Sequence, residues 1–164
     1  KVIVSSVLQR RDTLGVMSTG GGKSICYQIP ALLFKGITIV ISPLISLMKD
    51  QVDTLKLLGI KSVYINSTLS REEYSDAMGR IRSGNVKIIY IAPERLANEK
   101  FVTFIKKLNI AMIAVDEAHC ISQWGHDFRK SYLEIPNFVK KIGKPIQMLA
   151  LTATATAEVR QDRI

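Results

Sequence analysis

Met17-Ser18-Thr19-Gly20-Gly21-Gly22-Lys23-Ser24 follows a short β-branched run and precedes a stretch with helical spacing at residues 25–34. Consecutive glycines let backbone N–H groups converge on phosphate oxygens, and the helix that follows adds the positive end of its dipole. We therefore expect Lys23 to reach the outer phosphates of a nucleotide and the Ser24 hydroxyl to bind Mg²⁺. The predicted cofactor-binding residues are Thr19, Gly20, Gly21, Gly22, Lys23 and Ser24.

One position of this loop departs from the usual pattern. Met17 stands where such loops have their first glycine, whereas the Gly-Lys-Ser core keeps its setting between a strand and a helix. The alternative interpretation is a surface loop in which these three residues occur together by chance. The surrounding order of strands and helices favours the phosphate loop.

Six short β-branched runs recur along the chain, and stretches with helical spacing separate them. The runs cover residues 13–17, 37–42, 62–66, 86–92, 111–116 and 146–152. They are continuously apolar rather than alternating, which is typical of parallel strands covered by helices on both faces. The sequence thus predicts an α/β fold with a mostly parallel sheet, and ligands of such sheets bind beyond the carboxyl ends of the strands.

An acidic pair, Asp116-Glu117, ends the apolar run at residues 111–115 and precedes Ala118-His119. A carboxylate that emerges from a buried strand beside a phosphate loop can hold Mg²⁺, and its neighbour can orient or deprotonate the attacking water. We assign the metal to Asp116 and the water to Glu117, with Lys23 as the third catalytic residue. Alone, such a pair can equally be a turn and a helix cap.

Two further segments are candidates for nucleic-acid contact or for coupling. Thr152 and Thr154 lie at the end of the last predicted strand, where small hydroxyl residues relay hydrogen bonds or cap helices, and their chemistry alone assigns no role. Aromatic and charged residues follow the acidic pair. Aromatic rings can stack on unpaired bases, and cationic side chains can contact phosphates. The alternative places these aromatics in the core. The candidates in this second segment are Gln123, Trp124, His126, Asp127, Phe128 and Arg129.

These motifs together resemble superfamily-two helicases. The order of the Gly-Lys-Ser loop, the Asp-Glu-Ala-His box and the Thr-Ala-Thr segment is similar to theirs. The stretch CISQWGHDFR at residues 120–129 resembles the aromatic-rich loop of RecQ enzymes in particular. SPLISLMKDQ at 42–51 and APERL at 92–96 are similar to two further RecQ segments. A DEAD-box RNA helicase would instead show Asp at His119 and a later Ser-Ala-Thr segment.

The resemblance to RecQ enzymes implies a fold, cofactors and partners. It implies that residues 1–164 form the first RecA-like motor lobe of an ATP-dependent DNA helicase, with ATP and Mg²⁺ as cofactors. It further implies 3′-to-5′ movement on single-stranded or junction DNA, in DNA recombination and repair. An adenine-reading segment before Lys1 and a second lobe after Ile164 are expected on the same ground. A cross-lobe arginine is worth about 10³–10⁵ in rate, so the lobe alone should be nearly inactive.

Charge, cysteine content and hydropathy exclude some classes of protein but do not identify the function. The 164 residues carry a net charge of +9, which favours a polyanionic partner but also fits a solvated basic surface. Cys26 and Cys120 stand apart and predict buried thiols rather than a zinc site or a disulfide. No apolar run is long enough to cross a membrane. We expect a bacterial cytoplasmic or a nuclear protein; an RNA helicase lobe and a non-hydrolysing ATP-gated module are the alternatives.

Overall fold

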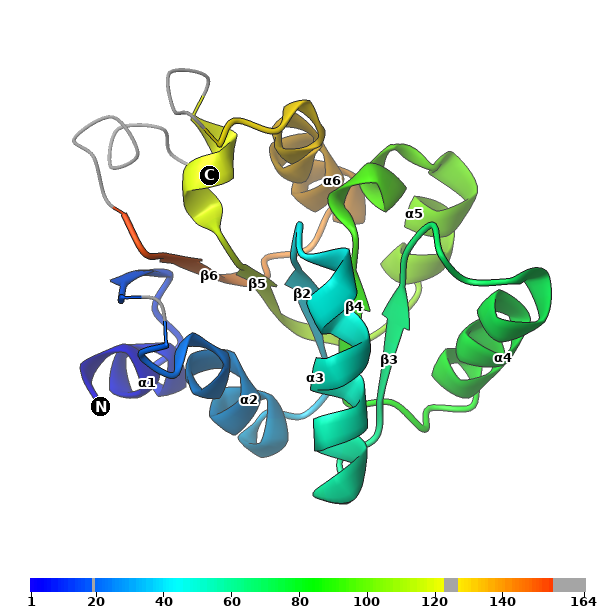
Figure 1. Cartoon of the computed structure of the whole chain (residues 1–164), viewed down its shortest axis with the longest axis horizontal. Coiled ribbons are helices and arrows are strands. Elements are labelled where there is room, and N and C mark those ends of the chain that lie inside the picture. Colours follow the sequence, from blue (N-terminus) through cyan, green and yellow to red (C-terminus); the bar gives the residue numbers. More distant parts are fainter. Residues whose placement is uncertain (19, 123–126, 155–164) are drawn as a thin grey trace.

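A computed structural model describes residues 1–18, 20–122 and 127–154 (Figure 1). Helices alternate with strands along nearly the whole chain. In chain order the elements are α1 Val2–Leu8, β1 Thr13–Val16, α2 Lys23–Leu33, β2 Ile37–Ile41, α3 Ile45–Leu57, β3 Ser62–Ile65, α4 Arg71–Arg82, β4 Ile88–Ile91, η1 Pro93–Ala97, α5 Glu99–Lys106, β5 Ile110–Val115, η2 Ala118–Ile121, η3 Lys130–Leu133, α6 Glu134–Ile142 and β6 Gln147–Thr152.

The described strands form one six-stranded sheet in the order β1-β6-β5-β2-β4-β3. Every pairing is parallel. All six predicted strands are present, and their observed ends differ from the predicted ones by a residue or two. The largest difference is at β4, predicted over 86–92 and observed over Ile88–Ile91. The predicted α/β class with a parallel sheet is confirmed.

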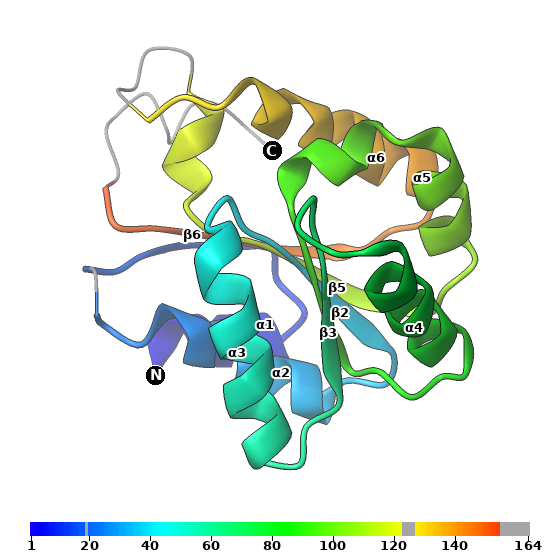
Figure 2. The ribbon, with the colours of Figure 1, turned by 45° about the vertical axis from the view of Figure 1, so that its right-hand side comes forward.

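Helices cover both faces of the sheet. The face on which a helix lies depends on whether successive strands are added toward the β3 edge or toward the β1 edge. From β1 to β3 the chain moves toward the β3 edge, and α1, α2 and α3 pack on one face. From β3 to β6 it returns, and α4, α5 and α6 cover the other face (Figures 1 and 2). Right-handed crossovers require this change of face when the direction reverses.

The two hydrophobic clusters are separated by the sheet, and the two cysteines lie one in each. Cys26 belongs to the cluster under α1, α2 and α3. Cys120 belongs to the cluster under α4, α5 and α6. Both thiols are buried and free, which confirms the predicted role as buried fillers and excludes a disulfide between them.

Helix α1 lies close against the sheet because β1 contains Gly15. A Cβ at this position would stand 2.7 Å from Ile3 Cδ1 and 2.7 Å from Leu151 Cδ2. The absence of a side chain therefore lets the apolar face of α1 approach β1 and β6. This approach completes the core beneath the strand that leads into the phosphate loop.

Helix α4 begins at the capping box that its sequence predicts. The Ser70 hydroxyl accepts a hydrogen bond from Glu73 N at 3.1 Å, and Glu73 Oε2 accepts one from Ser70 N at 2.8 Å. Two backbone donors that the helix leaves open are thus satisfied. Among the helices described, none has the length and apolar character needed to cross a membrane.

Candidate nucleotide-binding site

A cavity of 360 Å³ opens beyond the carboxyl ends of the strands, at the sheet edge that the sequence predicts. It brings together the loop after β1, the turn after β2, the acidic pair after β5 and one face of α2 and α3. Its described lining consists of Gly20, Gly22, Lys23, Ser24, Tyr27, Ser42, Leu44, Leu47, Met48, Gln51, Tyr90, Asp116 and Glu117. The phosphate-loop residues and the acidic pair, 94 positions apart in the sequence, therefore share one cavity.

The phosphate loop turns into α2 through glycines in the left-handed region. Gly20 has φ +83° and Gly22 has φ +75°, values that strain any residue with a Cβ. Gly22 caps α2, so this helix begins at Lys23, two residues earlier than predicted. Lys23 and Ser24 consequently stand in the first turn, where the helix dipole favours an anion. Gly21 lies between these two glycines, and Thr19 lies outside the described residues.

The acidic pair leaves β5 in an unusual backbone conformation. Asp116 N donates to Ile41 O at 2.8 Å, which extends the β5–β2 pairing by one residue. Glu117 then adopts φ +50°, which costs a non-glycine residue about 1 kcal/mol or more. The turn directs the Glu117 carboxylate toward the phosphate loop, and Lys23 Nζ donates to Glu117 Oε1 at 2.6 Å.

The electrostatic surroundings of Asp116 fit a cation. Burial raises the pKa of the Asp116 carboxyl, the neighbouring Glu117 charge raises it further, and Lys23 opposes both. A buried carboxylate beside a second one is stabilised by a divalent ion, and Mg²⁺ prefers one or two carboxylates, a hydroxyl and phosphate oxygens. Asp116 and Ser24 in one cavity provide such donors.

His119 connects the acidic pair to β6. Its Nδ1 lies 2.9 Å from Thr152 Oγ1 and 3.4 Å from Glu117 Oε2. The Thr152 hydroxyl also donates to Thr154 O at 2.8 Å and accepts from Thr154 N at 3.2 Å. The predicted threonines therefore belong to the same polar network as the acidic pair. This network is possible because β6 lies between β1 and β5.

The aromatic-rich segment is described only in its second half. Gln123, Trp124 and His126 lie outside the described residues. Asp127, Phe128 and Arg129 are exposed. His119 Nε2 lies 3.5 Å from Asp127 Oδ2, and Arg129 N donates to Cys120 O at 2.9 Å. The exposed Phe128 agrees with the prediction that this segment's aromatics lie outside the core.

Sequence reasoning missed the aromatic floor of the cavity. Tyr27 of α2 and Tyr90 of β4 meet edge to face, with ring centroids 6.2 Å apart and hydroxyls 3.4 Å apart. Burial raises the pKa of both hydroxyls, so they stay protonated hydrogen-bond donors. Gln51 also lines the cavity and accepts from Gln28 Nε2 at 3.1 Å. This hydrogen bond joins α2 to α3 beside the cavity.

Solved structures with the same fold are helicase domains. A structure described as a hypothetical ATP-dependent RNA helicase from Sulfolobus tokodaii matches 97% of this chain and 46% of that chain, with a TM-score of 0.73 and 19% identity. The Hef helicase domain of Pyrococcus furiosus matches 96% of this chain and 34% of that chain, with a TM-score of 0.71 and 23% identity. At these identities the likeness shows the RecA-like fold alone.

Curated relatives are similar over most of this sequence. The protein named ATP-dependent DNA helicase RecQ in Bacillus subtilis is 54% identical over 93% of this chain and 26% of its own length. Its namesake in Pasteurella multocida is 46% identical over 98% of this chain and 25% of its own length. The chain thus spans about a quarter of these relatives, and the predicted RecQ resemblance is confirmed. A family model described as DEAD/DEAH box helicase matches residues 1–162, so the chain belongs to the DEAD/DEAH box helicase family.

Proposed function

We propose that this chain is the first motor lobe of a longer ATP-driven DNA helicase, and that its cavity binds and hydrolyses ATP with Mg²⁺. The observation that carries the proposal is the meeting of Lys23, Asp116 and Glu117 in one cavity beside a glycine loop. An ammonium, two carboxylates and a helix start are the groups that a magnesium triphosphate needs.

Each side chain has one task in this proposal. Lys23 binds the outer phosphates, and the backbone of residues 20–22 holds the inner ones. Ser24 and Asp116 hold Mg²⁺, which neutralises phosphate charge when bound. Glu117, released from Lys23 by the phosphates, accepts a hydrogen bond from the attacking water and orients it. The buried rings of Tyr27 and Tyr90 exclude water from one wall of the cavity, which strengthens these interactions.

The DNA side of the proposal rests on the segment after η2. Exposed Phe128 and Arg129 offer a flat face and a cation to a single strand. Contacts from Asp127 to His119, and from His119 to Glu117, link that segment to the hydrolysis site. The 46–54% identity to proteins named as DNA helicases favours DNA over RNA as the substrate.

The test is ATP turnover by the full-length enzyme, measured alone, with single-stranded DNA and with single-stranded RNA. We expect DNA to raise the turnover number strongly and RNA to have little effect. Trp124→Ala should keep nucleotide affinity and lose most of the DNA stimulation, because it removes a stacking face worth about 1–3 kcal/mol. Stimulation by RNA alone would identify an RNA helicase, and absence of turnover under all conditions would leave only an ATP-gated binding module.

A further inference from the structure

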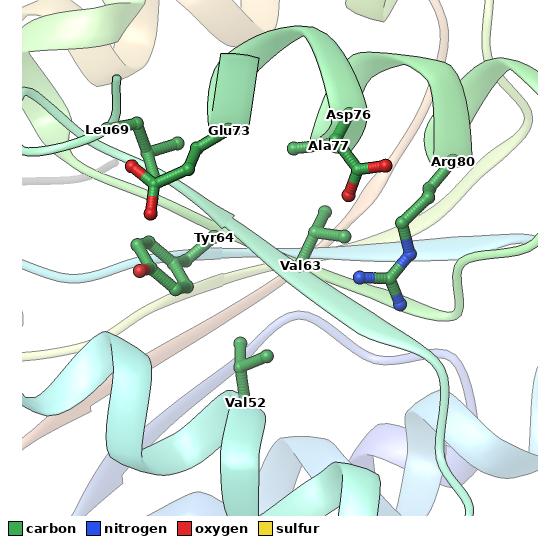
Figure 3. A pocket seen from close by; sticks show the side chains of 8 residues that line it. All are labelled: Val52, Val63, Tyr64, Leu69, Glu73, Asp76, Ala77 and Arg80. Carbon is green, nitrogen blue, oxygen red and sulfur yellow. The ribbon is translucent and has the colours of Figure 1, made fainter. Parts of the chain in front are cut away.

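The free edge of the sheet carries a hollow distinct from the nucleotide cavity. Among the described strands β3 is the last in the sheet, and no other described strand pairs with its outer edge. Beside it lies a hollow of 150 Å³ between α3 and α4 (Figure 3). Among the described residues it shares no lining with the nucleotide cavity. Its lining consists of Val52, Val63, Tyr64, Leu69, Glu73, Asp76, Ala77 and Arg80.

Tyr64 turns its backbone groups toward this hollow. Ala92 N donates to Ile65 O at 3.0 Å, so Ile65 presents its carbonyl to the β4 side. Alternate residues of a strand present their backbone groups to opposite edges, and Tyr64 therefore directs its N–H and C=O outward. An outward row of this kind is a template for another extended chain.

The carbonyls on either side of Tyr64 along this edge are already occupied. An Arg80 guanidinium nitrogen lies 3.4 Å from Ser62 O, and one of Arg95 lies 3.0 Å from Asn66 O. The Arg80 contact agrees with an outward Ser62 carbonyl, two residues before Tyr64. The two arginines occupy backbone carbonyls on either side of Tyr64. The backbone N–H and C=O of Tyr64 are therefore the groups on this edge that we expect to pair with another chain.

The walls of the hollow differ in chemistry. Glu73 and Asp76 extend their carboxylates from α4 toward the strand, with Arg80 one turn farther along (Figure 3). Val52 of α3 lies on the other side of the strand, where it and the Tyr64 ring form an apolar wall (Figure 3). The wall carries two carboxylates and one guanidinium, and one oxygen of Glu73 also accepts the capping hydrogen bond from Ser70 N. Its net charge is therefore negative, which favours a cation over nucleic acid.

We propose that this edge of β3 binds an extended peptide segment of a partner protein. The segment pairs its backbone with Tyr64, and because successive side chains of a strand point to opposite faces, it meets the two walls alternately. A lysine or arginine lies beside Glu73 and Asp76, and the adjacent apolar side chain packs on Val52 and the Tyr64 ring. The motif that fits is a basic residue next to an aliphatic one in extended conformation.

The probe for the test is a fluorescent seven-residue peptide that alternates lysine and valine, titrated onto the 164-residue chain at 150 mM salt. Two matched peptides accompany it: one with glutamate for lysine, and one with N-methyl groups on the central backbone nitrogens. We expect the first peptide to bind and both others to bind about tenfold more weakly, through charge repulsion and loss of backbone pairing. Equal binding of all three peptides would refute the proposal.

Protein variants locate the site. Asp76→Lys should weaken binding of the lysine peptide about tenfold, whereas Asp53→Lys, an equal charge change at an exposed α3 position outside the hollow, should change it less than about twofold. Both variants should keep the parent's thermal midpoint, which excludes misfolding. Equal weakening by the two variants would show a diffuse charge effect and overturn the assignment.

Amide hydrogen exchange measures directly whether the backbone N–H of Tyr64 is hydrogen-bonded to the peptide. The Tyr64 amide should exchange more slowly when the lysine peptide is bound, and should stay unchanged with the N-methylated peptide. Protection confined to other strands would contradict the proposal. Concentration-dependent protection of Tyr64 without any peptide would assign the edge to a second copy of this chain instead.

Discussion

The Lys23 ammonium lies 2.6 Å from a carboxylate oxygen of Glu117, and the two side chains are 13% and 18% exposed. In the proposed function, a nucleotide phosphate would have to replace Glu117 as the partner of Lys23. That exchange would free the Glu117 carboxylate when the triphosphate binds. On this proposal, nucleotide binding would itself release the water-orienting carboxylate. Until then, the Lys23–Glu117 ion pair compensates both charges.

The first prediction follows from this competition. Glu117→Gln leaves Lys23 without its carboxylate partner, so nucleotide affinity should be equal to or tighter than that of the parent. Turnover should fall by about 10²–10⁴, because an amide does not accept a proton from water. Titration with a fluorescent ATP analogue and steady-state phosphate release would measure the two effects. Affinity that falls together with turnover would contradict the competition.

The second prediction concerns the ammonium itself. Lys23→Ala should weaken ATP binding at least about tenfold, since a charge-assisted phosphate contact contributes about 1.5–3 kcal/mol. Lys35→Ala removes the same charge from an exposed position after α2 that does not line the cavity, and should leave affinity unchanged. The same titration serves both variants. Unchanged binding by Lys23→Ala would refute the phosphate-loop assignment.

The third prediction tests the network between β5 and β6. Thr152→Val keeps the shape of the side chain and removes the hydroxyl that meets His119. Nucleotide affinity should change less than about twofold, while turnover should fall about fivefold for a hydrogen bond of about 1 kcal/mol. In a double-mutant cycle with His119→Ala, the two losses should be non-additive. Additive losses would show that the two residues act independently.

The fourth prediction compares two glycines. Gly15→Ala places a Cβ within 2.7 Å of Ile3 and Leu151, and should lower the free energy of unfolding by about 1–3 kcal/mol. Gly79 lies inside α4, and a Cβ at this position would have no atom within 4 Å. Gly79→Ala should therefore raise the free energy of unfolding by about 0.4–1 kcal/mol. Urea unfolding followed by circular dichroism measures both. Equal effects would mean that α1 does not pack closely on β1.

The fifth prediction concerns the two thiols. Cys26 and Cys120 are buried, and burial raises the pKa of both, which suppresses the reactive thiolate. Native protein should therefore react slowly with a thiol reagent, and both residues should react at once in denaturant. Mass spectrometry counts the modified sites over time. Rapid labelling of either thiol in the native protein would contradict the described packing.

The sequence predicted the strands and helices and, through two motifs, the meeting of Lys23 with the acidic pair. It did not predict the long-range contacts outside those motifs. The apolar run at 111–116 predicts a buried strand, and Ser70 with Glu73 predicts a helix start, because each signal depends on neighbours in the chain. The position of β6 between β1 and β5 depends on contacts between distant segments. For the same reason the Tyr27–Tyr90 pair could not be foreseen: the two residues lie 63 positions apart and meet only across α2 and the sheet.

The order of the strands also connects the two halves of the site through β6. β6 ends at Thr152, whose hydroxyl meets His119, and it is bonded to β1 on one side and β5 on the other. The strand β6 is thus hydrogen-bonded to β1, which leads into the glycine loop, and to β5, which leads into the carboxylate pair. A change in the position of Thr152 would therefore reach both halves of the site through backbone hydrogen bonds, without any change in the residues that line the cavity.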